Sequence, residues 1–252
     1  MNLLKRTIKA GLYYSGISGL YGRFFLQNKA VILVYHRITS ESDNGGLCVT
    51  PEVFAMQMEY LAKHYNVLPL SKLVEHLQTG RQIPSRSCVV TFDDGTIDNF
   101  EIAFPILKKL SIPATFFVIG SRMEDPFYFN SNQADALLAN GQAIGAHTQT
   151  HPKLTKATDE ELLEELEVPF KNLNNAHAID SPCFAYPYGD FNPQVAEAVM
   201  NTGYCCAVTT QPGFVQEDSD LFALPRIQID NDSNSSVSLF ATRLQWIPRS
   251  AK

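Results

Sequence analysis

The sequence lacks an excess of positive charge. Its 20 lysines and arginines are outnumbered by 26 aspartates and glutamates, which gives a formal net charge of −6. Nucleic-acid binding depends on a basic surface that neutralises phosphate groups. The composition therefore gives no electrostatic support for a nucleic-acid partner, and we expect none.

Paired cysteines are also missing. The five cysteines are odd in number and none of them forms a C-x-x-C pair. A disulfide framework or a cysteine zinc site normally has such pairs, so the pattern argues against both and favours a reducing compartment. Several of the thiols lie in apolar runs, where a free cysteine behaves as a small buried hydrophobe. The five are Cys48, Cys88, Cys183, Cys205 and Cys206.

No uninterrupted apolar run of about 18 residues occurs, so a transmembrane helix is not expected. Residues 1–28 begin basic and turn apolar and aromatic, but glycines interrupt them and no A-x-A cleavage site follows, which argues against a cleaved secretory signal. We expect an amphipathic helix that packs on the domain; a helix resting on a membrane surface is the alternative. A cytoplasmic location, peripheral to the inner membrane in the second case, is favoured, and an exported one stays open.

Residues 29–252 have the pattern of one large α/β domain. Short apolar runs alternate with amphipathic segments, which is typical of βα units around a parallel sheet or barrel. About six or seven such units favour a barrel over an open sheet. Strands are expected at residues 30–38, 87–92, 114–120, 142–148 and 204–210, and helices at 50–65, 70–80, 98–110, 132–141, 158–173, 192–203 and 236–245.

Unusual polar residues follow the expected strands. They are His36 after "VILVY", Asp93 and Asp94 after "VVTF", His147 after "AIGA", and the segment "YPYG" after "PCFA". The carboxyl ends of parallel strands gather functional groups in α/β folds. We therefore expect these side chains to form one site.

Two histidines and a carboxylate suggest a metal centre. In "HTQTH", His147 and His151 are four residues apart, and a helical turn there would place both imidazoles on one side. With one carboxylate and open positions for water, such a set suits Zn²⁺ or a similar divalent ion, and the other aspartate is left free as a base. The alternatives are ordinary histidines and an Asp-Gly turn whose aspartate caps the next helix, although Asp98 is also available as that cap.

Together these segments resemble the polysaccharide deacetylases that share the NodB homology domain, carbohydrate esterase family 4. The resemblance covers roughly residues 30 to 230 and rests on "TFDDG", "HTQTH", "YPYG" and the strand "IPATFFV". It implies a distorted (β/α) barrel of about seven units and metal-dependent hydrolysis of the N-acyl group of an amino sugar. The implied partner is a glycan or glycolipid that contains an N-acetylated amino sugar.

The resemblance also implies a role for each matching residue. Asp94, His147 and His151 would hold the metal, most simply Zn²⁺, and Asp93 would be the general base that takes a proton from the attacking water. The backbone N–H of Tyr188 would stabilise the oxyanion.

The sequence departs from the family pattern at two positions. No histidine follows His177, where the usual general acid is expected, so we assign that role to His36 in "VYHRI", which resembles the subgroup of biofilm poly-N-acetylglucosamine deacetylases. A structural histidine is the alternative. The third motif usually has an arginine where this chain has Ala185, and Arg226 in "LPRI" is our replacement for it beside Asp93, with a surface salt bridge as the alternative.

Three functions remain distinct at this point. The leading hypothesis is a glycan or glycolipid N-deacetylase. Removal of a formyl group from an amino sugar on a lipid carrier would use the same groups. A catalytically inactive carbohydrate-binding domain is the third; loss of Asp93, Asp94 or one of the site histidines would be its signature, and all of these residues are present.

Overall fold

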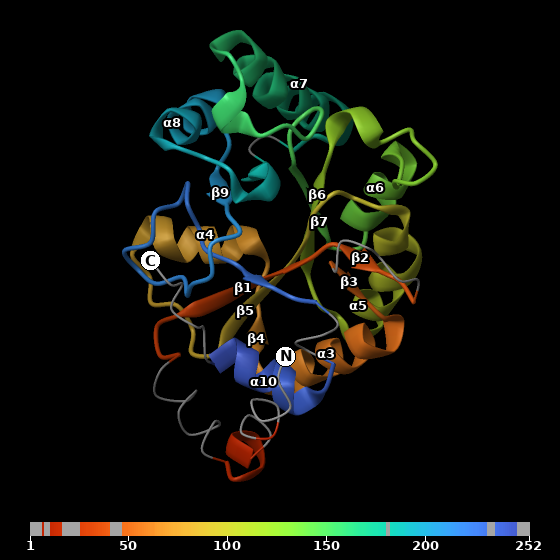
Figure 1. Ribbon diagram of the computed structural model, residues 1–252, viewed down its shortest axis with the longest axis vertical. Helices are drawn as coiled ribbons and strands as arrows, with labels where there is room; N and C mark the ends of the chain where they lie inside the picture. Colours follow the sequence, from red (N-terminus) through yellow and green to blue (C-terminus); the bar gives the residue numbers. More distant parts are fainter. Residues whose placement is uncertain are drawn as a thin grey trace.

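A curled parallel sheet is the centre of the computed structural model (Figure 1), which describes residues 7, 11–16, 26–40, 47–179, 182–230 and 235–245. The sheet has eight strands in the order β10-β1-β5-β6-β7-β8-β9, and β4 pairs with the first part of β5. The strands are β1 Ala30–Tyr35, β4 Asn66–Val67, β5 Ser87–Phe92, β6 Ala114–Val118, β7 Ala143–Ala146, β8 Cys183–Ala185, β9 Cys206–Val208 and β10 Ile227–Gln228. A separate pair joins β2 Arg37–Ile38 to β3 Cys48–Val49.

Helices follow most strands and lie around the sheet (Figure 1). Thr50 caps α3 by accepting from the N–H of Val53, and Thr158 forms a capping box with Glu161 at the start of α7. These caps explain why the helices begin where the sequence predicts. The α-helices are α3 Pro51–His64, α4 Leu70–Thr79, α5 Phe104–Leu110, α6 Ser131–Leu138, α7 Asp159–His177, α8 Pro193–Thr202 and α10 Val237–Gln245.

Both faces of the central strands are buried. All six residues of β1 and all six of β5 are buried, which explains why their sequences are largely apolar on both faces. On one face, Phe92 and Phe116 stack at 4.7 Å between ring centroids and belong to the larger core cluster. On the other face, Val89 and Phe117 belong to a second cluster that includes Leu73 of α4.

The predicted α/β barrel is confirmed, with an irregular closure. Among the described residues no ladder joins β9 to β10. Instead, the N–H of Ala207 donates to Leu221 O and the N–H of Thr209 donates to Leu224 O, so residues 221–224 run beside β9 before β10 pairs with β1. The sheet therefore curls far enough to bring residues after β9 next to the first strands.

Two expected elements differ from the structure. The strand expected at 30–38 is interrupted after Tyr35, and β2 begins at Arg37. The helix expected at 98–110 is helical from residue 97 but contains a π-helical turn, η1 Asn99–Ala103, directly before α5, where Pro105 has no N–H to donate to the preceding turn. Asp98 does not cap this helix with its side chain, which instead accepts from Arg37 Nε at 3.0 Å.

Most of the predicted N-terminal helix lies outside the described residues. Within it, residues 11–14 are helical. No helix in the described part of the chain combines the length and the apolar character needed to cross a membrane.

Candidate active site

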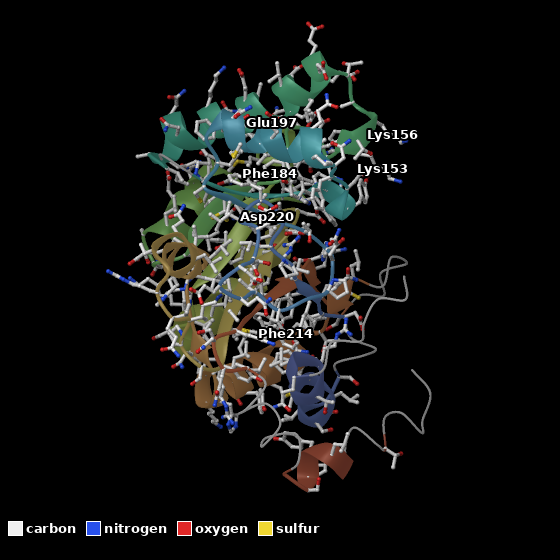
Figure 2. All side chains as sticks on the ribbon, turned by 90° about the vertical axis from the view of Figure 1, so that its left-hand side faces the viewer. Lys153, Lys156, Phe184, Glu197, Phe214 and Asp220 are labelled. Carbon is white, nitrogen blue, oxygen red and sulfur yellow. The ribbon has the colours of Figure 1, made fainter. Side chains whose placement is uncertain are left out.

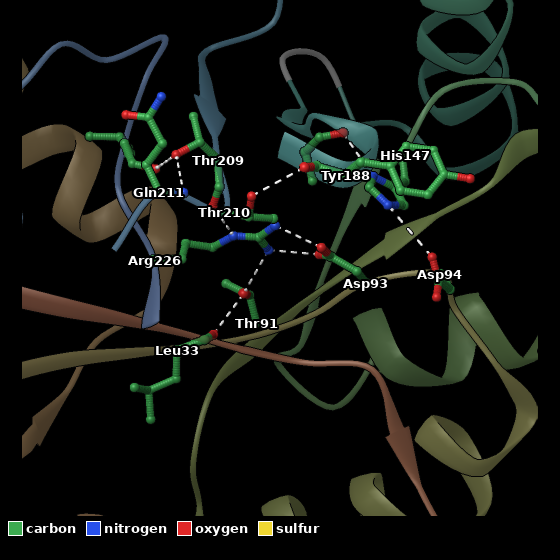
Figure 3. Close-up of polar contacts among 12 residues, drawn as sticks. Leu33, Thr91, Asp93, Asp94, His147, Tyr188, Thr209, Thr210, Gln211 and Arg226 are labelled. Carbon is green, nitrogen blue, oxygen red and sulfur yellow. Dashed lines mark hydrogen bonds and ion pairs between the residues drawn. The ribbon is translucent and has the colours of Figure 1, made fainter. Parts of the chain in front are cut away.

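The polar residues at the strand ends line one cavity, as the sequence predicts. Figure 3 shows Asp93, Asp94, His147 and Tyr188 of this set close together. The cavity has a volume of about 350 Å³. It is lined by His36, Leu47, Asp93, Asp94, His147, His151, Tyr188, Thr210 and Gln228. Of the seven predicted site residues only Arg226 is not in this lining, because it lies behind Asp93.

Asp94, His147 and His151 have the geometry of a metal-binding set. Asp94 Oδ1 lies 3.6 Å from Nε2 of His147 and also 3.6 Å from Nε2 of His151. This separation is too long for a hydrogen bond. It fits two ligands of one ion, because donors bonded tetrahedrally to zinc at about 2.1 Å lie about 3.4 Å apart. The ligand atoms of all three residues are within 4.8 Å of one another, so the residues present fit a single divalent ion.

Hydrogen bonds orient the two imidazoles toward Asp94. His147 Nδ1 lies 2.7 Å from Ala185 O, and since a carbonyl only accepts, Nδ1 has the proton and Nε2 has a free lone pair. His151 Nδ1 is 3.2 Å from the hydroxyl of Tyr188. Burial, followed by the nearby His147, lowers the pKa of His151 to about 4. His151 is therefore neutral at neutral pH, and the hydrogen bond of His147 Nδ1 directs its Nε2 toward Asp94.

The segment between the two histidines is a loop and not the helical turn that the four-residue spacing suggested. Thr148 and His151 both have left-handed backbone angles, with φ of 64° and 69°. The buried carboxylate of Glu165 in α7 accepts from the N–H groups of Gln149 and Thr150, at 2.9 and 2.8 Å, and from the Thr150 hydroxyl. Glu165 therefore replaces the hydrogen bonds that a helical turn would have supplied.

Asp93 forms a buried bidentate ion pair with Arg226 (Figure 3). Arg226 Nη1 donates to Asp93 Oδ1 at 2.7 Å, and Nη2 donates to Oδ2 at 2.6 Å. The two side chains are 0% and 2% exposed, so a surface salt bridge, the alternative for Arg226, is wrong. Burial alone would raise the pKa of Asp93, but the charge and hydrogen bonds of Arg226, together with the nearby histidines, outweigh it and hold the pKa well below the usual range. Asp93 is therefore ionised.

Arg226 is itself held by three other contacts. Its Nε donates to Thr209 O at 2.8 Å, and Nη1 lies 3.2 Å from the Thr91 hydroxyl. The guanidinium also lies 5.8 Å from the centre of the Phe117 ring. The contacting residues lie in β5, in β6 and directly after β9. Arg226 directly precedes β10 and reaches Asp93 from there, whereas Ala185, where the family arginine is expected, lies in β8.

His36 lies at the end of β1 and faces the cavity. Its Nδ1 is buried and has no hydrogen-bond partner among the described residues. Burial lowers the pKa of His36, and the charges of Asp93 and Asp94 only partly offset this effect. The resting imidazole is therefore neutral.

Left-handed backbone concentrates at this site. Asp94 and Tyr188 have φ of 73° and 58°, conformations that cost about 1–2 kcal/mol for residues with a side chain. Each precedes a glycine, and a Cβ on Gly95 would come within 3.0 Å of Val118 Cγ1. The turns thus aim Asp94 and Tyr188 into the site at a local energetic cost.

Sequence reasoning missed Glu165 and the rim of the site. Glu165 lies in an acidic helix and resembles a solvated residue, but it shares the helical face of Leu162 and Leu166, which was an available signal. At the rim, Tyr188 is 60% exposed, and Lys153 Nζ lies 5.8 Å from its ring centre. Figure 2 shows Lys153 and Lys156 projecting from the same edge of the molecule.

Comparison with known proteins gives consistent results. Residues 80–207 match the family model described as polysaccharide deacetylase. The Bacillus subtilis protein YxkH, whose name places it among the polysaccharide deacetylases, is 31% identical over 209 residues, which are 82% of this chain and 74% of that protein. A poly-beta-1,6-N-acetyl-D-glucosamine N-deacetylase of Staphylococcus epidermidis is 28% identical over 235 residues, 82% of this chain and 81% of that one.

A solved structure has a similar fold over most of its length. The Streptococcus pyogenes deacetylase PplD, in complex with acetate, superposes with a TM-score of 0.77 and 27% identity. The similarity covers 82% of this chain and 94% of that one.

Proposed function

The chain belongs to the polysaccharide deacetylase family. We propose that its catalytic centre is the cavity that contains Asp94, His147 and His151. As a member it is a hydrolase of carbon–nitrogen bonds that acts on N-acetylated glycans. The observation that most supports the location of the centre is the equal distance of 3.6 Å from Asp94 Oδ1 to both imidazole Nε2 atoms.

The donor set suits Zn²⁺, since two neutral imidazoles and one carboxylate are common zinc ligands that leave a position open. A divalent ion held there would polarise the acyl oxygen of the substrate and lower the pKa of a water molecule. The proton transfers and the stabilisation of the oxyanion are assigned to residues of the protein.

Asp93 is assigned as the group that takes the proton from the attacking water. It is ionised, lines the cavity, and is fixed by two hydrogen bonds from Arg226. The same ion pair makes Asp93 a weak base, so it holds the proton only briefly. Arg226 thus orients Asp93 and keeps it charged, without contact with the substrate.

His36 is assigned as the group that protonates the leaving amine. Its resting imidazole is neutral, so it first accepts a proton and then delivers it. Its place in the same cavity as Asp93 supports transfer of the water proton between them. The amine nitrogen is a poor leaving group until it is protonated, which makes this delivery necessary.

Tyr188 is assigned to the oxyanion of the tetrahedral intermediate through its backbone N–H. Its turn is supported by the Thr210 hydroxyl, which donates to Tyr188 O at 3.2 Å. The ring of Tyr188 is 60% exposed at the edge of the cavity, where it could contact the neighbouring sugar of a longer glycan. We propose a β-linked N-acetylglucosamine polymer as the substrate, by analogy with the Staphylococcus epidermidis relative.

An assay of acyl release tests this function. Purified protein is incubated with N-acetylglucosamine oligomers, and with matched N-formyl and lipid-linked amino sugars, and released acetate or formate is measured. We expect acetate release that is lost after chelation and restored by Zn²⁺. Formate release alone would favour the deformylase, and glycan binding with no release in any metal would favour an inactive binding domain.

A further inference from the structure

Three cysteines form a cluster outside the catalytic cavity. Cys183 begins β8 and Cys206 begins β9, and the two are register partners on adjacent parallel strands. Cys205 directly precedes β9, and its N–H donates to Pro182 O at 3.1 Å. Cys183 Sγ and Cys205 Sγ are 3.3 Å apart, and the three sulfur atoms all lie within 4.8 Å of one another.

The cluster is separate from the Asp94, His147 and His151 site. It lies at the first residues of β8 and β9, whereas the catalytic groups follow the last residues of the strands. Within the described part of the chain, the cluster's three possible ligands are all sulfur atoms, and the catalytic set has only nitrogen and oxygen. Soft thiolates select metals such as Cu(I), and imidazole with carboxylate suits harder divalent ions.

We propose that Cys183, Cys205 and Cys206 bind one thiophilic metal ion, for which Cu(I) is the best match to a set of three sulfur donors. The absence of C-x-x-C spacing hid this set in the sequence, because Cys183 reaches the other two across neighbouring strands rather than along the chain.

Binding of a cation by the cluster needs no redox step. The ion takes the place of the thiol protons, which pass to solvent, and no oxidation is required.

One cysteine of the cluster is accessible to solvent and the other two are buried. Cys205 is partly exposed, whereas Cys183 is 8% exposed and Cys206 is inaccessible. Cys183 and Cys206 belong to the second core cluster, with Val208 and Leu224 among its members. Such surroundings exclude competing water from the bound ion.

A disulfide between Cys183 and Cys205 is the main competing outcome. Their sulfur atoms are 3.3 Å apart, whereas a disulfide requires about 2.05 Å and would leave Cys206 without a role.

Titration of the reduced full-length protein with Cu(I) against a chromophoric Cu(I) chelator tests the proposal. We expect one equivalent of Cu(I) to be retained, with ultraviolet thiolate-to-metal absorption. Cys205→Ser should lose that equivalent, and Cys48→Ser, which removes a partly exposed cysteine outside the cluster, should keep it. Zn²⁺ added in excess should bind elsewhere without displacing Cu(I).

A second measurement needs no variant and stays valid if Cys205→Ser fails to fold. One equivalent of Cu(I) should protect Cys205 of the unmodified protein from alkylation, as measured by peptide mass spectrometry. Failure to retain Cu(I) against the chelator, equal retention by Cys205→Ser, or a Cys183–Cys205 disulfide in place of protected thiols would overturn the proposal. None of these outcomes depends on deacetylase activity.

Discussion

Removing Arg226 should destabilise the fold far more than removing a surface ion-pair partner. Arg226 and Asp93 are 0% and 2% exposed, so Arg226→Met leaves a carboxylate charge buried without its partner. Such a loss costs about 3–5 kcal/mol of unfolding free energy. An exposed pair such as Glu167–Lys171 contributes about 1 kcal/mol or less, so Lys171→Met is the matched control.

A double-mutant cycle separates the ion pair from general packing. Asp93→Asn leaves Arg226 unpaired and should also be costly, but the double variant Asp93→Asn/Arg226→Met leaves no unpaired charge. Urea unfolding should therefore give a double-variant cost at least about 2 kcal/mol below the sum of the single costs. Additivity within about 0.5 kcal/mol would contradict this expectation, because it would mean that the two side chains do not stabilise each other.

Three further predictions concern the loops of the site. Glu165→Gln should weaken Zn²⁺ binding by about 10–100-fold in a calorimetric titration, because it loosens the loop before His151. An unchanged Zn²⁺ affinity would show that Glu165 does not position His151. Gly95→Ala should lower the free energy of unfolding by more than Gly80→Ala, which costs about 1–2 kcal/mol. Both glycines have positive φ, but only Gly95 has other atoms close to the added Cβ. Equal costs would contradict the close approach of Val118 to Gly95. Tyr188→Phe should retain most of kcat, since the proposed role belongs to the backbone N–H, and a loss of about 100-fold or more would assign the role to the hydroxyl instead.

Local patterns in the sequence predicted most helices and strands because their causes are local. Thr50 and Thr158 cap the helices that they were expected to cap, and the buried run at 87–92 is β5 as predicted. One of the two exceptions has a local cause, and the other has a long-range cause. Pro105, which has no N–H to donate, directly follows the π-helical turn and Phe104. The strand break after Tyr35 accompanies a hydrogen bond that Asn99 Nδ2 donates to His36 O, 63 positions away in the sequence.

The convergence of the site residues could be predicted because strand order places their ends together. The exact partners could not. The ion pair of Asp93 with Arg226 joins residues 133 positions apart, and its burial depends on how far the sheet curls. The cysteine cluster and the Glu165 contacts similarly depend on register between strands and on helix packing, which spacing along the chain does not encode.

Paired measurements on Asp94→Asn and Asp93→Asn separate the proposed metal ligand from the proposed base. Both variants and the wild type are purified identically, their zinc content is measured by elemental mass spectrometry, and acetate release from N-acetylglucosamine oligomers is followed. We expect Asp94→Asn to lose both metal and activity, and Asp93→Asn to keep the metal content of the wild type and lose activity. Full metal content in Asp94→Asn, or wild-type turnover by Asp93→Asn, would contradict the assigned division between ligand and base.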